Sequence, residues 1–74
     1  SVINPEMMFF GEVGLTGEVR NVAHVQSRIS EGRKLGFKTF VIPAGNLVGL
    51  EKQAPGIDII GVKTVEEALD ATLR

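Results

Sequence analysis

The sequence predicts a small α/β fold in which a β-hairpin is followed by a helix, two strands and a second helix. Three glycines divide an early β-prone segment, as expected of a hairpin. Two amphipathic segments carry helix-capping residues, which indicates two helices. Two short apolar runs stand well apart along the chain, which favours parallel strands with helices packed alongside. We therefore expect a mixed sheet, with an α+β arrangement as the borderline alternative.

The hairpin is expected in GEVGLTGEVR, the stretch from Gly11 to Arg20. The residues before it are apolar, and Thr16-Gly17 can supply the positive φ that a tight turn needs. The pattern predicts antiparallel strands near residues 7–14 and 18–22. Because Gly11 and Gly14 weaken a strand, they indicate a bulge or the close approach of another backbone.

The first helix is predicted over residues 23–35, with its apolar stripe at Val22, Val25, Ile29 and Gly32. A glycine on that stripe costs about 1 kcal/mol of helix propensity, which suggests close packing of the helix on the sheet. Gly36 is placed as the residue after the C-cap, where a left-handed conformation ends helices. Phe37 can then fold back on the last turn.

The rest of the chain supplies two buried strands and a second helix. FKTFVIP is predicted to be a strand that ends at Pro43, and IDIIGV is predicted to be the second. Between them we expect a loop with one helical turn, capped by Asn46 and leaving through Pro55-Gly56. Thr64 and Glu67 form a capping box. The last helix is expected to bury one face, made of Val65, Ala68, Leu69 and Leu73.

Composition narrows the classes of function. The 74 residues include 8 basic and 9 acidic ones, a formal charge of −1 that argues against a strongly basic nucleic-acid module. There is no cysteine, which excludes disulfides and thiolate metal sites on this chain. No apolar run approaches the ~18 residues of a membrane span. We expect a cytoplasmic protein, and a fragment of a longer one because the sequence begins without Met.

Three candidate chemical sites are weak. The glycine spacing is not that of a nucleotide-binding loop. His24 has no second histidine or cysteine to complete a metal site, so no metal ligand is predicted. Glu12 and Glu18 could form a carboxylate pair for acid–base catalysis, but two solvated residues on a hairpin are the favoured interpretation.

A basic flank is the remaining candidate. Five of the eight basic residues lie between positions 20 and 38. They could be a solvated face or could contact nucleic-acid phosphates, with Arg20 and Arg28 as the first candidates. The predicted DNA-binding residues are Arg20, Arg28, Arg33, Lys34 and Lys38.

Three motifs carry a resemblance over essentially the whole chain: GEVGLTGEVR, LGFK followed by a proline five residues later, and GVKTVEEAL. Together with Asn4-Pro5-Glu6 and Asn46, they resemble the Lon-protease-like domain, in the form that ends a family of bacterial DNA repair ATPases. The resemblance implies that residues 1–74 are the C-terminal portion of such a domain.

The resemblance also implies that the peptidase site is degenerate at Gln26. Lon peptidases use a serine and a lysine, the lysine lying in a Gly-Gly-Leu-Lys segment of the helix after the hairpin. Those four positions fall on Ala23 to Gln26 here. An amide cannot accept the proton of a serine, and Ser1, Ser27 and Ser30 do not match the serine motif. No catalytic residue is predicted, and the chain is expected not to be an enzyme.

The function implied is therefore a non-catalytic assembly and DNA-contact domain of an ATP-dependent DNA repair and recombination protein. ATP, Mg and Zn would bind that protein outside this chain. Its expected partners are branched or single-stranded DNA, further copies in a homo-oligomeric ring, and a recombinase, with no membrane. Two alternatives remain open. One is a Lon-type serine peptidase fragment that takes its lysine from elsewhere, for which Lys38 is poorly placed. The other is an interaction module without a DNA role.

Overall fold

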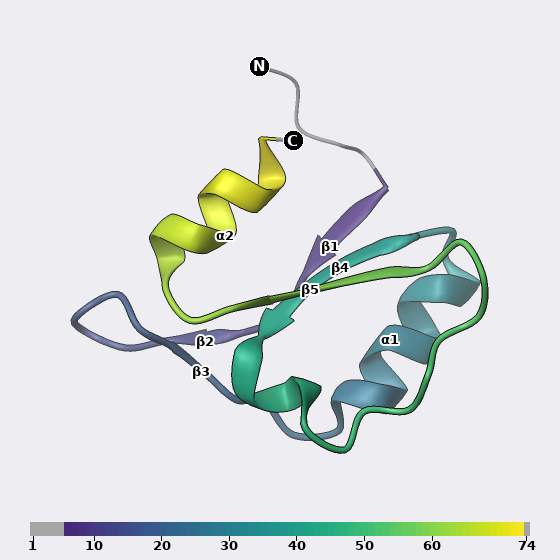
Figure 1. Ribbon diagram of the computed structural model, residues 1–74, viewed down its shortest axis with the longest axis horizontal. Helices are drawn as coiled ribbons and strands as arrows, with labels where there is room; N and C mark the ends of the chain where they lie inside the picture. Colours follow the sequence, from purple (N-terminus) through teal and green to yellow (C-terminus); the bar gives the residue numbers. More distant parts are fainter. Residues whose placement is uncertain (1–5, 74) are drawn as a thin grey trace.

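The computed structural model describes residues 6–73, whose helices and strands are arranged as Figure 1 shows. In chain order they are β1 (Met7–Phe9), β2 (Glu12–Val13), β3 (Val19–Arg20), α1 (Val25–Lys34), β4 (Thr39–Pro43), the 3₁₀ turn η1 (Ala44–Leu47), β5 (Asp58–Val62) and α2 (Val65–Thr72). The α/β class is confirmed. Parallel and antiparallel pairing both occur, but in two separate sheets rather than in one mixed sheet.

The larger sheet is parallel, with strand order β1-β4-β5. The predicted parallel pairing of the two apolar strands is confirmed by a register that runs from Thr39 opposite Asp58 to Pro43 opposite Val62. Successive residues of a strand face opposite sides, and both sides of the central strand β4 are buried. Phe40 and Ile42 pack on the side of α1, whereas Val41 packs on the side of α2. Figure 1 shows the two helices on opposite sides of this sheet. An apolar strand without alternation is what burial on both faces requires.

The predicted first strand, residues 7–14, is wrong as a single element. Met7–Phe9 pairs in parallel with β4, and only Glu12–Val13 forms the hairpin with β3. The chain changes sheets at Gly11, where an added Cβ would lie 2.8 Å from Phe9 Cζ and 2.9 Å from Val19 Cγ1. Gly11 therefore leaves room for the side chains of Phe9 and Val19. The sequence had suggested a bulge or the close approach of another backbone.

The turn of the hairpin agrees with its glycines. Gly17 has φ 84°, so the predicted positive φ is confirmed. The Gly17 N–H donates to Gly14 O at 3.1 Å, and the Gly14 N–H donates to Glu18 O at 2.9 Å. This pattern fits a type I turn followed by a left-handed residue in a bulge. Gly14 leaves room for the carboxylate of Glu18, which occupies the space of the missing Cβ.

The C-terminal end of α1 is a Schellman motif, as Gly36 predicted. Gly36 has φ 98° and its N–H donates to Arg33 O at 3.0 Å. The Phe37 N–H donates to Gly32 O at 3.0 Å. These two bonds satisfy carbonyls that a helix end otherwise leaves without partners. Phe37 packs against the core under α1, so its expected fold-back is confirmed.

Gly32 brings α1 close to the sheet. Ile29 and Gly32 are the buried residues of this helix. A Cβ at Gly32 would lie 3.0 Å from Phe40 Cζ and 3.2 Å from Met8 Sδ. The sequence-based explanation of this glycine as a close-packing residue is confirmed.

Asn46 is not a helix cap. Pro43 occupies the N-cap of η1 without a side-chain bond. The carboxamide of Asn46 instead accepts from the Val22 N–H at 2.9 Å and donates to Val22 O at 3.1 Å. Both bonds are partly buried, and they fasten the loop after β4 to the segment before α1. The predicted exit at Pro55-Gly56 is confirmed by a turn with φ 91° at Gly56.

The start of α2 was predicted correctly, and its buried face was predicted correctly only at Ala68. The Glu67 N–H donates to Thr64 Oγ1 at 3.1 Å and the Thr64 N–H donates to Glu67 Oε1 at 3.2 Å, which is the capping box. Ala68 and Ala71 face the sheet, however, while Leu69 and Leu73 are 58% and 52% exposed. The small alanines let the helix lie close on Val41 and Val62, which turns the leucines outward.

Candidate nucleic-acid interface

The five predicted DNA-binding residues do not form one flank. Lys38 stands before β4, at the end of the sheet where both β4 and β5 begin. Arg20 lies at the opposite end, because the Val19 N–H donates to Lys63 O just after β5. Five residues of strand separate the two ends by roughly 16 Å. Arg33 and Lys34 end α1 on the Lys38 side, and Arg28 lies on the same helix nearer its start.

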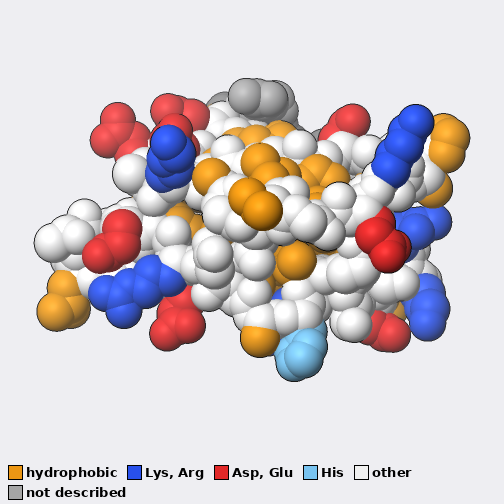
Figure 2. Space-filling model, turned by 60° about the horizontal axis from the view of Figure 1, so that its bottom comes forward, with side chains coloured by type: hydrophobic (Ala, Val, Ile, Leu, Met, Phe, Trp, Pro, Cys, Tyr) orange, Lys and Arg blue, Asp and Glu red, His pale blue; other side chains and the backbone are white. Residues whose placement is uncertain are grey.

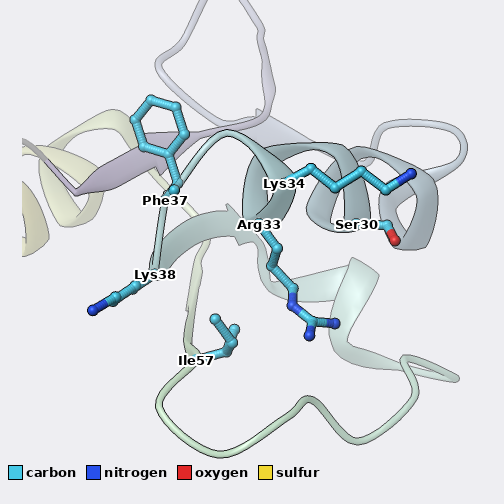
Figure 3. Close-up of a pocket in the computed structure, with 7 residues that line it drawn as sticks. Ser30, Arg33, Lys34, Phe37, Lys38 and Ile57 are labelled. Atoms are coloured by element: carbon cyan, nitrogen blue, oxygen red, sulfur yellow. The ribbon is translucent and has the colours of Figure 1, made fainter.

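Arg33, Lys34 and Lys38 surround an open hollow of about 490 Å³, which we call the basic hollow (Figure 3). Its lining also includes Ser30, Gly36, Phe37 and Ile57. Figure 3 shows Arg33 reaching from the last turn of α1 towards Ile57, while Lys34 and Lys38 extend to opposite sides. The hollow thus has cations around it and aliphatic carbon at Ile57.

Local structure brings these cations together. The Schellman motif reverses the chain after Lys34, so that Lys38 returns beside the end of α1. The Asp58 N–H then donates to Lys38 O at 2.9 Å, which fixes Lys38 next to the start of β5. The backbone positions of these three residues are therefore set by backbone hydrogen bonds.

The basic hollow is lined by cations, and carboxylates lie outside its lining. No carboxylate is among the residues that line it. Lys34 Nζ lies 3.5 Å from Glu31 Oε1, with both side chains 72% exposed, so this pair is weak. Within residues 6–73, Arg33 and Lys38 have no ion-pair partner. Counting the neighbouring Glu6, Glu31 and Asp58 against the three cations (3 − 3) leaves no net formal charge around the hollow, although its lining itself is basic.

Arg20 is in a different environment, because two carboxylates neighbour it. Its Nη2 lies 3.6 Å from Glu18 Oε2, and Glu12 is its partner across the hairpin. The pKa of Glu18 is lowered, first by the hydrogen bond from the Thr16 hydroxyl, which lies 3.0 Å from its Oε1. A general acid needs a raised pKa, so Glu18 is unsuited to that role. Figure 2 likewise shows blue side chains lying among red ones on the left side of the molecule.

Arg28 is held at the start of its helix. Its Nε donates to Ala23 O at 3.0 Å, and the residue is exposed. It does not line the basic hollow. DNA contact at any of the five residues stays a prediction, but the structure groups three of them and separates Arg20 and Arg28 from that group.

The residue at the expected lysine position, Gln26, makes a structural contact. It is half-buried in the first turn of α1, and its Oε1 accepts from the Glu51 N–H at 3.3 Å. The carboxamide thereby ties the loop after η1 to the helix. Lys38 lies beyond the other end of this ten-residue helix, about 15 Å along its axis, so it does not replace the missing base. Ser1 lies outside the described residues.

The residue just before α1 has an unusual backbone. His24 occupies the N-cap of α1 with φ 58° and ψ 38°, the left-handed conformation, and makes no side-chain cap bond. Among residues 6–73 it is the one non-glycine residue with positive φ. The same part of the chain contains no group of three or more histidine, cysteine or acidic residues that could hold a metal ion.

Sequence comparison finds close relatives over nearly the whole chain. The chain is 54% identical over 70 residues to DNA repair protein RadA of Bacillus subtilis, which is 95% of this chain and 15% of that protein. It is 49% identical over 70 residues to the RadA of Halalkalibacterium halodurans, again 95% of this chain and 15% of that protein. The RadA of Chlamydia muridarum is 48% identical over 62 residues, covering 82% of this chain and 14% of the relative.

The chain is homologous to a segment of RadA. It spans only about 15% of the length of the first two of these RadA proteins. The similarity confirms the resemblance to a bacterial DNA repair protein. No protein-family model matches the chain, and the assignment to a Lon-like domain stays a prediction. Within residues 6–73, neither helix has the length and apolarity needed to cross a membrane.

Sequence reasoning missed the lining of the basic hollow other than its cations. Ile57 lies 19 positions after Lys38 and reaches the hollow because β4 and β5 pair in parallel. Ser30 was considered only as a serine of the peptidase motif. A signal for the site was present in the helix end, since a left-handed Gly36 directly after the C-cap returns the following residues towards the last turn of α1.

Proposed function

We propose that this chain is a non-catalytic part of a DNA repair protein of the RadA type, in which it contacts DNA and helps copies of the protein to assemble. The observation that carries the DNA part is the grouping of Arg33, Lys34 and Lys38 around the basic hollow. The similarity to proteins named for DNA repair supports the same partner.

Phosphate contact needs cations that carboxylates do not already neutralise. Arg33 and Lys38 meet this requirement, whereas Arg20 has Glu18 at 3.6 Å and Glu12 opposite it. We therefore assign the DNA contact to the basic hollow rather than to Arg20. Arg28 is the next candidate because it is exposed on the same helix.

The assembly part rests on an exposed apolar surface, which we call the apolar patch. It consists of Phe9, Val13, Leu69 and Leu73, which are 39%, 52%, 58% and 52% exposed. Phe9, Val13 and Leu69 also line an apolar hollow of about 190 Å³ together with Val65, Ala68 and Thr72. Contiguous apolar surface of this kind is typical of protein–protein contacts. We propose that it packs against another part of the longer protein or another copy.

The wider role extends beyond this chain. We propose that the longer protein is a cytoplasmic DNA-dependent ATPase of repair and recombination, which binds ATP, Mg and Zn in segments other than this one. Branched or single-stranded DNA, a homo-oligomeric ring and a recombinase are its proposed partners. Gln26 supports the view that this segment does not cut peptides, because its amide bonds the Glu51 backbone and cannot act as a base.

The test is DNA binding of the 74-residue chain over a series of salt concentrations, using a labelled branched DNA. We expect binding to weaken steeply as salt rises, because phosphate contacts release counterions. The double variant Arg33→Gln/Lys38→Gln should bind more weakly with a shallower salt dependence. Arg20→Gln is the matched control and should bind as the parent does.

Two results would contradict the proposal. Binding that is absent at low salt would remove the DNA contact and favour an interaction module without a DNA role. Cleavage of an unstructured protein by the chain would favour the peptidase alternative. A lysine from elsewhere would then have to take the place of Gln26 as the base.

A further inference from the structure

We infer that the outer edge of β5 is a docking site for an extended segment of a partner protein, which adds a strand to the parallel sheet and places basic side chains beside α2. This contact is separate from the proposed DNA contact and from the apolar patch, since no residue of β5 belongs to either surface. Three features of the edge lead to it: unpaired backbone groups, a hollow lined by carboxylates, and an exposed leucine on the other face of the sheet.

The backbone of β5 is unpaired along its outer side. The strand order β1-β4-β5 gives β5 one neighbour in the sheet. The Asp58 N–H donates to Lys38 O at 2.9 Å, so the backbone groups of Asp58 face β4. Because these groups alternate in direction along a strand, those of Ile59 and Gly61 point away from β4. Within residues 6–73 they have no hydrogen-bond partner. Such an edge accepts a further strand through main-chain hydrogen bonds.

On the α2 side of the sheet (Figure 1), the edge opens onto a hollow of about 240 Å³, which we call the acidic hollow. It is lined by Ile60, Gly61, Val62, Glu67, Asp70 and Ala71. Two of these residues are carboxylates and none is basic. Glu67 Oε1 already accepts from the Lys63 and Thr64 N–H groups, at 2.6 and 3.2 Å. Asp70, in contrast, has no ion pair among the residues that the structure describes.

Asp70 stands where a helix favours a cation. It is exposed in the last turn of α2, which contains no basic residue. The carboxylate therefore lies at the negative end of the helix dipole without compensation. A lysine or arginine side chain of an added strand would neutralise this carboxylate and interact favourably with the helix end.

The α1 side of the edge calls for an apolar side chain. Gly61 pairs with Ile42, which packs on that side. Leu47 lies over Gly61, where an added Cβ would be 3.1 Å from Leu47 Cγ, and Leu47 is 44% exposed. Side chains of a strand alternate between the two faces of its sheet. We therefore expect basic and apolar residues to alternate in the segment that binds.

Charge favours such a segment over a second copy of the chain. Two β5 edges joined in an antiparallel sheet, by a twofold axis perpendicular to it, would bring both α2 helices to the same face. Glu67 and Asp70 of one copy would then approach the same residues of the other. Like charges at short distance repel, whereas a basic segment is attracted.

The experiment measures binding of a fluorescein-labelled Lys-Val-Lys-Val-Lys-Val peptide to the full 74-residue chain by fluorescence anisotropy. A peptide with glutamate in place of lysine should bind about tenfold more weakly. Two further peptides are N-methylated, one at the valines and the other at the lysines. A strand bonds its neighbour through every second residue, so one of these two should lose binding and the other should keep it.

Amide hydrogen exchange followed by NMR locates the bound peptide. The N–H groups of Ile59 and Gly61 should exchange about tenfold more slowly when the peptide is bound, because they then donate to it. Those of Ile60 and Val62 already face β4 and should change little.

Asp70→Asn separates binding from folding. It removes the unneutralised charge of the acidic hollow and should weaken binding of the lysine peptide by about two- to fivefold. It should also raise the midpoint of thermal unfolding slightly, because the charge opposes the helix dipole. Glu66→Gln removes an exposed carboxylate of the same helix that does not line the acidic hollow, and it should leave peptide binding unchanged.

Three outcomes would overturn the inference. One is failure of the lysine peptide to bind at low salt. Another is equal binding of the lysine peptide and both N-methylated forms, which would show a charge contact without an added strand. The third is slow exchange of Ile59 and Gly61 in the chain without peptide that becomes fast on dilution, which would identify a second copy as the occupant. None of them affects the DNA contact, which the salt series tests separately.

Discussion

At the scale of single residues, His24 combines an unfavourable backbone with no compensating side-chain bond. Its φ of 58° is adopted at the N-cap of α1 without a cap hydrogen bond. A left-handed conformation costs a non-glycine residue roughly 1–2 kcal/mol. Glycine pays no such cost, although it gives the unfolded chain more freedom.

His24→Gly should therefore raise the free energy of unfolding by about 0.5–1 kcal/mol. His24→Val should lower it, because a β-branched side chain tolerates positive φ poorly. Urea denaturation of the chain measures both. Ala23→Gly is the matched control, since Ala23 does not have positive φ, and it should not stabilise. A His24→Gly chain that is less stable than the parent would mean that the imidazole has contacts of its own.

Glu18 gives a prediction about pH. Its pKa is lowered from the ordinary value of 4.5, first through the Thr16 hydroxyl. Because the folded pKa lies below the unfolded one, the ionised carboxylate stabilises the fold above pH 4.5, and this stabilisation is lost as the pH falls through the lowered pKa. Thr16→Val should raise the pKa of Glu18 towards 4.5, as followed by carboxyl-carbon NMR titration. Arg20→Gln should raise it less, and an unchanged pKa in Thr16→Val would contradict the assignment.

At the scale of the elements, α1 depends on a glycine that helix propensity opposes. Gly32→Ala should gain about 1 kcal/mol of propensity and lose roughly 1–3 kcal/mol from overpacking. The second effect should win, because Phe40 and Met8 occupy the space that the new methyl group needs. We expect a net loss of about 1 kcal/mol in unfolding free energy. Ser27→Ala on the exposed side of the same helix should instead stabilise slightly, and a stabilising Gly32→Ala would show that α1 can move outward.

The ends of the helices and the hairpin turn could be predicted from neighbouring residues in the sequence. The pairing of strands that lie far apart in the sequence could not. Gly36, Gly17 and the Thr64–Glu67 box were recognised because their hydrogen bonds join residues at most five positions apart. The partner of Met7–Phe9 is β4, 32 positions away from residue 7 at residue 39. Nothing in the four-residue apolar run of residues 7–10 tells whether its partner is the next strand or a distant one. The same limitation explains Asn46, whose partner Val22 lies 24 positions away.

In the candidate site, too, features set by neighbouring residues were predicted and features set by distant pairing were not. The sequence predicted its cations, since Arg33, Lys34 and Lys38 fall within six consecutive positions. It could not separate them from Arg20, because that separation depends on the two ends of the parallel sheet. It also could not find Ile57, whose place in the hollow is set by the register between β4 and β5. Similarly, Leu69 and Leu73 were predicted to be core residues, but Ala68 and Ala71 take the face of α2 towards the sheet.

At the scale of the whole molecule, the apolar patch should govern association. Burial of one leucine side chain contributes about 1.5–3 kcal/mol, and a tenfold change in an association constant needs about 1.4 kcal/mol. Leu69→Gln/Leu73→Gln should therefore weaken self-association at least tenfold, as measured by sedimentation equilibrium. Val48→Gln removes an 86% exposed apolar residue outside the patch and is the control. Equal association of all three chains would show that the patch serves a different contact.

The arrangement of β4 also has a consequence for how the chain acquires its fold. Its neighbours in the sheet are Met7–Phe9 and Asp58–Val62, so Thr39 pairs with residues 32 positions before it and 19 positions after it. Contacts this distant slow folding relative to helical bundles. During synthesis, Phe40, Val41 and Ile42 must also leave the ribosome well before β5 exists to cover their edge. For that interval the most buried strand of the finished protein is its most adhesive segment, and this segment is where a nascent chain would most need a chaperone.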